Sequence, residues 1–326
     1  MRTTARLLGT MAALLMTGGS VAATETAEQY PSKPVRLVVA FSPGGGVDTI
    51  ARTIAEGLTR IWQQPVVVEN RPGAGSSIGT RQVSRAPADG YTFLVTSTSY
   101  AVNPYLYKEP GYSADDFAPI INAGYSPTLI FSTPSTPVTT LKELVELSKA
   151  QDLSYATAGV GTISHLSTEN LLNVVAGTNM THVGYNGAGP AFQAVVGGHV
   201  PVGALPFATP GLLEWIKEGK LKPLAISGDK RIAALPEVPT ISESGFEVNA
   251  DYTWVGFFVP AGTPQDIIVK ANEAIGAAMR EDKVQQVLSG LGFDWEPNTT
   301  EQFDEYVRSE LTNWEKVVQS SGVVVE

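Results

Sequence analysis

The sequence predicts an α/β protein of two lobes, with two strands that cross between them. Strand-like apolar segments alternate with amphipathic helical segments along most of the chain, which favours largely parallel sheets with right-handed crossovers. Three of these strands run directly into a glycine-rich turn and a helix. The last strand-like segment, 251–259, is followed by helices alone. We therefore expect this segment to return to the first lobe and to bring the C-terminal helices with it.

The first lobe begins at residues 35–41, a near-continuous apolar run typical of a strand buried on both faces of a sheet. A helix is expected at 48–62, because Ile50, Ile54 and Leu58 recur every four residues on one face. The rest of the lobe is expected to hold strands at 65–69 and 91–96 with a helix at 76–85 between them. Loops with short helical pieces are expected over 96–125, leading to a crossing strand at 117–123.

The second lobe begins near Thr128 and again alternates strand with helix. Thr140 and Glu143 have the spacing of a capping box, which predicts the start of its first helix. Its strands are expected at 129–132, 153–158, 181–185, 200–205 and 221–227. Its later helices are expected to begin near Ile163, Pro190 and Gly211.

The C-terminal part is expected to add helices to the first lobe, the last at 300–319. We therefore assign residues 24–124 and 252–326 to lobe 1 and residues 125–251 to lobe 2. The two crossing strands then join the lobes and leave a cleft between them.

Residues 1–23 have the features of a secretory signal peptide, with arginines near the start, an apolar stretch and small residues before a cleavage point near Ala22 or Ala23. The apolar stretch is shorter than the roughly 20 residues of a membrane-spanning helix, and no later stretch reaches that length. No cysteine follows it to carry a lipid. We expect an exported protein with no stable membrane association.

Composition excludes several function classes. Removing Arg2 and Arg6 leaves 20 basic and 32 acidic residues, a net charge of 20 − 32 = −12, which argues against nucleic-acid partners. The absence of cysteine rules out disulfides, thiol chemistry and cysteine-bound zinc. The three histidines lack metal-binding spacing, and no glycine motif has the dinucleotide-binding spacing. We expect no metal and no cofactor.

The glycine-rich turns at 42–46, 159–162 and 186–190 are the candidate functional elements. Glycine lets backbone N–H groups approach a ligand, and the helix that follows presents unpaired N–H donors and a partial positive charge. Such a place suits a carboxylate or a phosphate. Each turn alone also fits an ordinary connection between strand and helix.

Several motifs together resemble the tripartite tricarboxylate transporter substrate-binding family, also called the Bug receptors. They occur in order from Tyr30 to the C-terminal part and read YPSKPVRLVVAFSPGGGVDTIAR, QPVVVENRPGAGSSIG, ADGYTFLV, DFAPI, YATAGVGTISHL, HVGYNGAGPA, GKLKPLAIS, LPEVPTISESGF and VPAGTP. The resemblance implies a periplasmic, type II-like Venus flytrap fold. It also implies a monomeric binding protein, not an enzyme, that closes on a di-, tri- or aromatic carboxylate and delivers it to the membrane permease subunits of a secondary transporter.

Carried over by position, the ligand loops of the family imply a set of candidate ligand-binding residues in both lobes. They are Phe41, Ser42, Pro43, Gly44, Gly45, Gly46, Asp48, Thr96, Ser97, Thr98, Ala158, Gly159, Gly161, Thr162, Ser164, His165, Tyr185, Asn186, Gly187 and Phe207. Asp48 is expected to cap its helix, and His165 either to contact the ligand or to brace its turn. A Gly161→Asp substitution is expected to abolish acid binding by placing a carboxylate in the anion site.

Two departures from the family pattern leave the ligand class open. Asn186 stands where relatives often have a basic residue, and Ala204 to Phe207 stand where relatives usually have aspartates. The second lobe is therefore expected to be less polar than usual, with room for an aromatic or uncharged ligand face near Phe207.

Two other functions stay open. Ser77 lies in a G-x-S-x-G pattern with histidines downstream, as in a serine hydrolase, but it lies well beyond its strand whereas a nucleophile elbow places serine at the strand end. We therefore expect no catalytic residue. The other alternative is a binding protein whose closed form presents its surface to a sensor protein instead of a permease. Transport and signalling both need closure driven by the ligand, so the sequence does not separate them.

Overall fold

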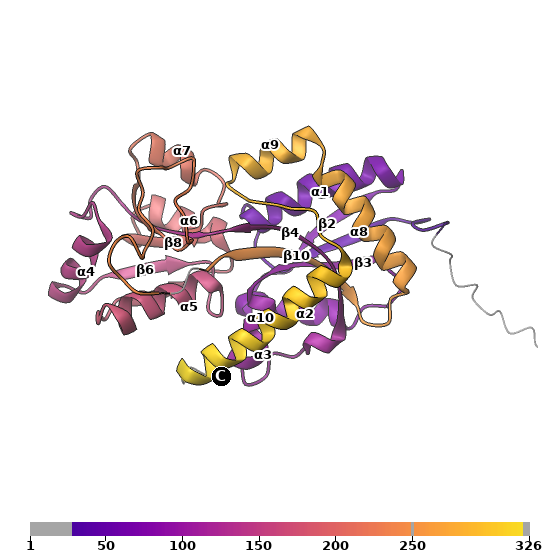
Figure 1. Ribbon diagram of the computed structural model, residues 1–326, viewed down its shortest axis with the longest axis horizontal. Helices are drawn as coiled ribbons and strands as arrows, with labels where there is room; N and C mark the ends of the chain where they lie inside the picture. The colour runs from indigo at the N-terminus through magenta and orange to yellow at the C-terminus, as the bar shows by residue number, and fades with distance from the viewer. Residues whose placement is uncertain (1–27, 249–250, 322–326) are drawn as a thin grey trace, which may run out of the picture.

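The computed structural model describes residues 28–248 and 251–321. The expected signal peptide lies outside the described residues. The chain forms two lobes side by side, each built on a five-stranded sheet with helices packed against it (Figure 1). The two-lobed α/β fold predicted from the sequence is confirmed.

The first sheet has the strand order β2-β1-β3-β10-β4. The strands β1, β2 and β3 are parallel, whereas β10 runs antiparallel to both β3 and β4. Their bounds are β1 Val35–Val39, β2 Val66–Asn70, β3 Thr92–Ser97, β4 Phe117–Ser126 and β10 Thr253–Pro260. The strand β10 is buried along its whole length because it lies between two neighbours and under helices.

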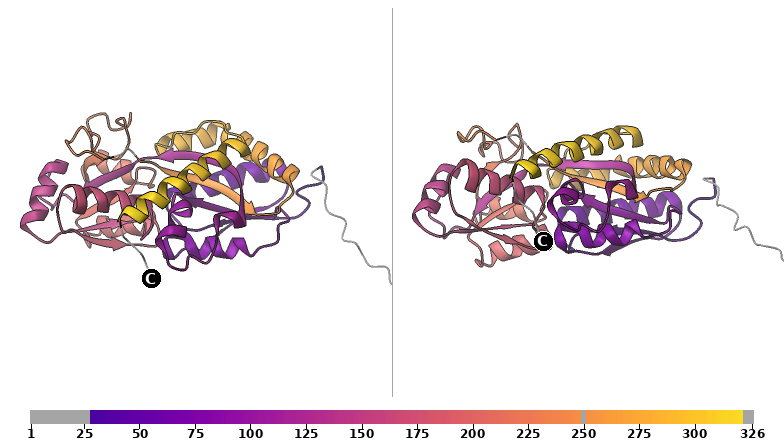
Figure 2. Two further views of the ribbon diagram at one scale, coloured as in Figure 1. Left: turned by 60° about the horizontal axis from the view of Figure 1, so that its bottom comes forward. Right: turned by 90° about the horizontal axis from the view of Figure 1, so that it is seen from below.

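Helices on both sides pack against this sheet. The helices α1 and α8 pack together on one side of the lobe, and α3 and α10 pack together on the other (Figure 1). The bounds are α1 Gly46–Trp62, a 3-10 turn Ala74–Ser76 that leads into α2 Ser77–Ser84, α3 Ser99–Leu106, α8 Gln265–Met279, α9 Asp282–Gly290 and α10 Thr300–Ser321. Figure 2 shows α10 running along the first lobe towards the second.

The second sheet has the strand order β7-β6-β8-β5-β9. The strands β6, β7 and β8 are parallel, as the strand–helix alternation predicts, but β5 is antiparallel to β8 and β9. The strand bounds are β5 Thr128–Ser132, β6 Ser154–Thr157, β7 Thr181–Gly184, β8 Val202–Pro206 and β9 Lys222–Ile226. The direction of β5 follows from its entry, because β4 continues into it across Pro127 alone.

The helices of the second lobe begin where the sequence predicts. The capping box at the start of α4 is confirmed, since Glu143 N–H donates to Thr140 Oγ1 at 3.2 Å and Thr140 N–H donates to Glu143 Oε2 at 3.2 Å. The bounds are α4 Leu141–Ala150, α5 Ile163–Glu169 with a π-helical continuation Asn170–Val175, α6 Ala188–Val196 and α7 Leu212–Lys217.

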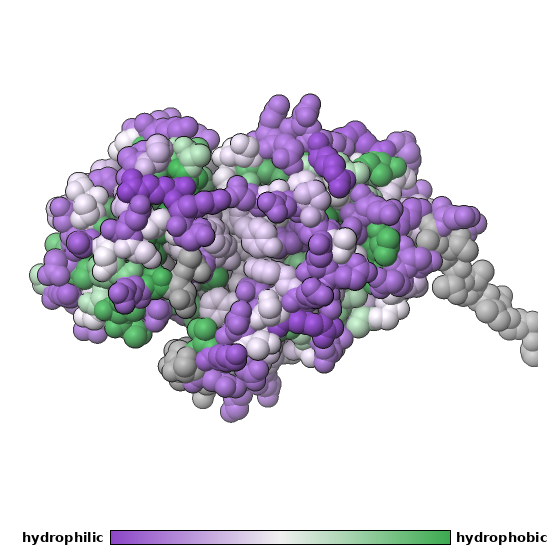
Figure 3. Space-filling view, in the orientation of Figure 1, coloured by the Kyte–Doolittle hydropathy of each residue, from purple (hydrophilic) through white to green (hydrophobic). Residues whose placement is uncertain are grey.

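The lobes have separate cores, and an additional apolar cluster joins them. That cluster brings Val102 and Leu106 of α3 and Val318 of α10 against Val160 and Leu166 of the second lobe. The face seen in Figure 3 is mostly hydrophilic, with paler residues along the band between the lobes. Within the described ranges, no helix has the length and apolar character of a membrane span.

Candidate ligand-binding site

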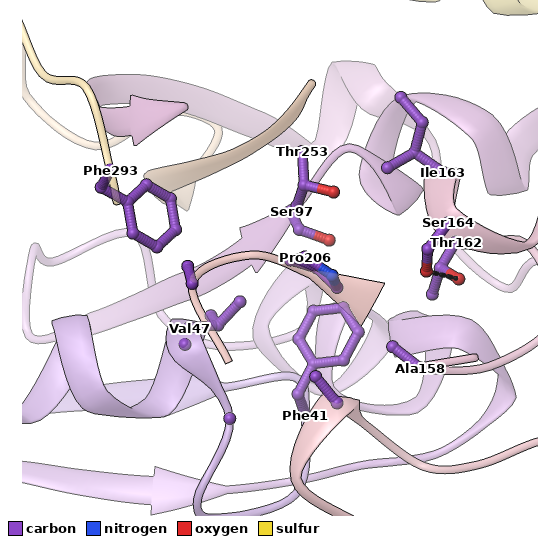
Figure 4. A pocket seen from close by; sticks show the side chains of 14 residues that line it. Phe41, Val47, Ser97, Ala158, Thr162, Ile163, Ser164, Pro206, Thr253 and Phe293 are labelled. Carbon is purple, nitrogen blue, oxygen red and sulfur yellow. Dashed lines mark hydrogen bonds between the residues drawn. The ribbon is translucent and has the colours of Figure 1, made fainter. Parts of the chain in front are cut away.

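A cavity lies between the two sheets, where β1, β3, β6 and β8 end (Figure 4). Loops at the carboxyl ends of parallel strands are the usual ligand sites of α/β proteins. The cavity holds about 40 Å³, which is room for the centres of roughly three water-sized groups. It is lined by Phe41, Gly45, Gly46, Val47, Ser97, Ala158, Thr162, Ile163, Ser164, Ala188, Pro206, Ala208, Thr253 and Phe293. No charged side chain is among them.

Four hydroxyl groups supply the polar side chains of the wall. Ser97 and Thr253 come from β3 and β10 of the first lobe, and their oxygens point towards the side where Ser164 lies (Figure 4). Thr162 and Ser164 come from the second lobe, and their oxygens are 3.2 Å apart. Thr253 is 5% exposed, and within the described chain its Oγ1 has no hydrogen-bond partner. A buried hydroxyl without a partner is costly unless a ligand or water completes it.

The first glycine turn brings the N-terminus of α1 to the cavity. Gly46 and Val47 lie in the first helical turn, whose N–H groups have no acceptor inside the helix. The turn is held in place by Asp48, which accepts hydrogen bonds from Gly44 N–H at 3.0 Å and from Asn70 Nδ2 at 2.8 Å. The carboxylate therefore caps the turn and points away from the ligand space.

Asp48 is anchored as an ion. Burial opposes its ionisation, but hydrogen bonds from Arg52, Asn70 and the Gly44 N–H outweigh that penalty and lower the pKa of the Asp48 carboxyl below its usual value. Arg52 Nε donates to Asp48 Oδ2 at 3.0 Å. The negative charge of Asp48 is thus already compensated where the glycine turn needs a fixed shape.

The N-terminus of α6 faces the N-terminus of α1 across the cleft. A Cβ atom placed on Gly45 would lie 3.6 Å from the Gly189 nitrogen and 3.8 Å from the Ala188 nitrogen. Both helix ends carry a partial positive charge, so each repels the other and both attract an anion in the space between them. The unpartnered Thr253 hydroxyl faces the same cavity.

Other candidate residues of the first turns hold the lobes together and do not line the cavity. Ser42 N–H donates to the Asn186 carbonyl at 3.0 Å, which is a direct backbone bond between the lobes. Gly187 packs against Ser42, because a Cβ on Gly187 would lie 3.2 Å from the Ser42 nitrogen. Pro43 and Gly44 pack against Gly189 in the same way. In this structure these residues make the contacts that close the cleft, and their ligand role stays a prediction.

Strand geometry separates Ser97 from its neighbours. Successive side chains of a strand point to opposite faces, so Thr96 turns away from the cavity when Ser97 points into it. Thr98 lies past the end of β3, as the residue before α3. Thr98 Oγ1 accepts a hydrogen bond from Trp254 N–H at 3.2 Å. Thr96 is fully buried away from the lining.

His165 braces its own turn and does not reach the cavity. Its Nδ1 accepts a hydrogen bond from Gly161 N–H at 3.4 Å, and its ring stacks on His182 with centroids 3.9 Å apart. Gly159 packs against the Tyr185 carbonyl, so Gly159 and Tyr185 support the turn from behind. Of the second-lobe candidates, Ala158, Thr162 and Ser164 line the cavity.

Gly161 faces the first lobe instead of the ligand space. A Cβ on Gly161 would lie 2.4 Å from Asn103 Oδ1, and its φ of +80° already disfavours any side chain. The expectation that Gly161→Asp acts by charge in the anion site is therefore replaced by a steric one. Any side chain at this position pushes α3 away from the second lobe.

Phe207 does not line the cavity. Its ring packs on Gly292, where a Cβ would lie 2.3 Å from the ring, and its neighbours Pro206 and Ala208 face the cavity instead. The lining residues outside the candidate list are Val47, Ile163, Ala188, Pro206, Ala208, Thr253 and Phe293. Val47, Ile163 and Ala188 directly adjoin the glycine turns, so their position was a usable signal. Thr253 and Phe293 come from the returning chain and have no local motif.

Ser77 lacks the geometry of a catalytic nucleophile. Its Oγ accepts a hydrogen bond from Asn103 Nδ2 at 3.0 Å, and in the described part of the chain no histidine bonds to it. Among the same residues, no group of three histidine, aspartate or glutamate side chains is placed to hold a metal ion.

The stacked pair His165 and His182 predicts how the stability of the fold depends on pH. Burial, with His165 beside it, lowers the pKa of His182 to about 3, and its Nε2 lies 2.7 Å from Thr157 Oγ1. The unfolded chain takes up this proton near pH 6.5 and the folded chain does not, so stability falls as pH drops below 6.5 and continues to fall towards 3. Because of His182, we expect the free energy of unfolding to fall by about 2 kcal/mol between pH 7.5 and pH 5.

Denaturant unfolding at the two pH values measures this effect. The paired variant His182→Phe with Thr157→Val removes the titrating ring and its partner, and we expect a smaller fall in stability. An equal fall in that variant would contradict the assignment to His182.

Comparison with known proteins gives a consistent answer. Residues 50–323 match the family model described as "Tripartite tricarboxylate transporter family receptor". Protein BugT of Bordetella pertussis is 33% identical, over 97% of this chain and 98% of its own. The structure of the periplasmic binding protein BugD is 34% identical with a TM-score of 0.85, over 91% of this chain and 100% of its own.

Two further similar structures contain a ligand. A Rhodopseudomonas palustris protein with adipate is 31% identical with a TM-score of 0.84, over 90% of this chain and 99% of its own. MatC of the same species, with bound malate, is 31% identical with a TM-score of 0.83, over 89% of this chain and 100% of its own. The family match over most of the chain agrees with the two lobes and the cavity between them. The chain therefore belongs to the tripartite tricarboxylate transporter receptor family.

Proposed function

We propose that this protein is a periplasmic receptor that closes on one small organic acid and delivers it to the permease subunits of a tripartite tricarboxylate-type transporter. The observation that carries the proposal is the cavity between the lobes. Two helix N-termini and four hydroxyl groups converge there, and no charged side chain lines it. Residues 1–23 are then the export signal, removed before the receptor works.

Backbone dipoles and hydroxyls are sufficient to bind an acid without arginine. Each hydrogen bond to a charged group contributes roughly 1.5–3 kcal/mol, and a helix N-terminus adds roughly 0.3–1 kcal/mol. Four or five such bonds supply about 6–15 kcal/mol before the cost of association, and micromolar binding needs about 8 kcal/mol. An anion between α1 and α6 also removes the repulsion between the two helix ends, so it favours closure.

The ligands of relatives support an acid as the cargo. The two R. palustris structures hold adipate and malate, which are both small dicarboxylates. The cavity of about 40 Å³ favours an acid of few carbon atoms. Its contacts come from both lobes, as a receptor that reports ligand by closing requires.

Calorimetric titration of the mature protein with malate and with adipate tests the proposal. We expect one site per chain for at least one of them, together with a smaller radius of gyration in solution scattering. Failure of both acids to bind at millimolar concentration, or binding with an unchanged scattering profile, would contradict the proposed function.

A further inference from the structure

A second cavity, the α10 cavity, lies between β4, α10 and the segment that joins α9 to α10. It holds about 510 Å³, and small-molecule sites usually hold about 300–1,000 Å³. It is lined by Asn122, Tyr125, Glu296, Pro297, Asn298, Gln302, Phe303, Glu305, Tyr306 and Ser309. None of these residues lines the cavity between the lobes. The α10 cavity is therefore a separate place for a ligand.

A bulge in β4 turns two polar side chains towards the α10 cavity. Asn122 pairs with Gly256 and Tyr125 pairs with Trp254, so β4 has one extra residue between the two pairs. Residues three apart in a regular strand point to opposite faces, and the extra residue brings them to the same face. Directly opposite residues share a face, and a Cβ on Gly256 would lie 2.6 Å from Phe303 Cζ of α10. Asn122 and Tyr125 therefore both face α10.

The amide of Asn122 is buried there with one group unpaired. Asn122 is 3% exposed, and its Oδ1 accepts a hydrogen bond from Gly124 N–H at 2.8 Å, which fixes the orientation of the amide. Its Nδ2 has no acceptor among the described residues. Its backbone is already engaged, because Asn298 bonds to both the N–H and the carbonyl at 2.9 Å. A buried donor without an acceptor is costly, so an oxygen atom of a ligand would complete this wall.

The charge of the α10 cavity is negative. Glu296 and Glu305 line it and are exposed, and in the part of the chain that the structure describes neither forms an ion pair. No lysine or arginine is in the lining. Arg308, one turn along α10 from Glu305, is already paired with Asp304 at 2.7 Å. The two carboxylates are thus free to attract a cation.

Aromatic side chains favour an organic cation over a metal ion. The rings of Tyr125 and Tyr306 meet edge to face with centroids 5.7 Å apart, and Phe303 adjoins them in the lining. Burial, together with the carboxylates of Glu310 and Glu296, raises the pKa of the Tyr125 phenol, so this ring stays neutral. Aromatic faces attract ammonium groups, including quaternary ones. Within the described ranges, no three acidic or histidine side chains are placed to hold a metal.

We propose that the α10 cavity is a second binding site, for a small organic cation that carries a hydroxyl or carbonyl oxygen. The oxygen accepts a hydrogen bond from Asn122 Nδ2, and the ammonium group binds the carboxylates of Glu296 and Glu305 and the tyrosine rings. The preferred charge is opposite to that of the cavity between the lobes, where two helix N-termini favour an anion. The cation is thus a different ligand from the acid of the proposed function.

Three probes that differ by one feature test the ligand class. Choline carries a charge and a hydroxyl, ethyltrimethylammonium lacks the hydroxyl, and the neutral isostere 3,3-dimethylbutanol lacks the charge. Each is titrated calorimetrically into the mature protein at physiological ionic strength. We expect choline to bind at one site per chain, about fivefold or more tightly than either of the others. High salt is expected to weaken choline and to leave the neutral isostere unchanged.

Glu296→Gln and Glu305→Gln locate the site without disturbing the core, since both side chains are exposed. Each is expected to weaken choline about threefold or more and to leave the neutral isostere unchanged. Glu315→Gln is the matched control, because Glu315 lies outside the lining and about 15 Å further along α10 than Glu305. That distance exceeds the screening length of about 8 Å. In Asn122→Ala the affinity ratio of choline to ethyltrimethylammonium is expected to fall towards one.

Each part of the proposal has an outcome that overturns it. If the neutral isostere binds as tightly as choline, the preference for a cation is wrong. If ethyltrimethylammonium binds as tightly as choline, the role of Asn122 is wrong. Wild-type choline affinity in both glutamate variants, or no saturable choline binding in the millimolar range, would overturn the site itself. These titrations contain no organic acid, so such results would leave the proposed receptor function standing.

Discussion

Gly46→Ala is expected to weaken ligand binding by about 10- to 100-fold while the first lobe stays folded. Gly46 is the first residue of α1, and a Cβ there would lie 2.7 Å from the Ala208 carbonyl oxygen and 3.2 Å from Ala208 Cβ. Ala208 follows β8 of the second sheet, so the added methyl separates the lobes. Overpacking of this kind costs about 1–3 kcal/mol, and each 1.4 kcal/mol is tenfold in affinity.

The backbone of Gly46 is compatible with alanine, which distinguishes this prediction from one of strain. Its φ is not in the left-handed region, and alanine is the better helix former. Gly276→Ala in α8 is the control, because a Cβ there meets its nearest atom at 3.6 Å. Calorimetry with the acid that binds best compares the two variants. Equal affinity in Gly46→Ala and the wild type would show that Gly46 and Ala208 lie farther apart in the ligand-bound protein than in this structure.

Asp48→Ala is expected to destabilise the protein by about 2–3 kcal/mol and to weaken binding. The change leaves the Gly44 N–H, one Asn70 amide hydrogen and the Arg52 guanidinium without their acceptor. Asn70 Nδ2 also bonds the Phe41 carbonyl at 3.0 Å, so the glycine turn loses its anchor together with its cap. Denaturant unfolding measures the loss of stability.

The exposed pair Asp304 and Arg308 is a matched control, since it has the same i, i+4 spacing in α10. The side chain of Asp304 is 37% exposed, against 5% for Asp48. Exposed pairs of this kind contribute about 0.3–0.5 kcal/mol. If Asp304→Ala and Asp48→Ala cost the same, the carboxylate of Asp48 is not the organising group of the turn.

Local patterns predict the elements because each one carries its own periodicity and punctuation. The capping box at Thr140 and the glycines at 44–46 mark helix starts that the structure reproduces within two residues. The pairing of β10 between β3 and β4 is not local, yet it follows from the lack of any other sheet for the last helices.

Only part of the candidate site is predictable from the sequence. The turns around Gly45 and Thr162 reach the cavity, but the sequence does not say which residues of a turn face the ligand and which face the other lobe. Ser42 and Asn186 meet through backbone atoms, which side-chain chemistry does not reveal. Thr253 enters the cavity only because β10 crosses back from the second lobe, a contact made by topology alone.

The central claim is tested most directly by native mass spectrometry of the receptor, purified from the periplasm without denaturation. The molecule that it releases is then identified. The account predicts one small organic acid per chain. A bound molecule with no acid group would contradict the receptor proposed here. So would a protein that stays empty and whose Tm responds to neither malate nor adipate.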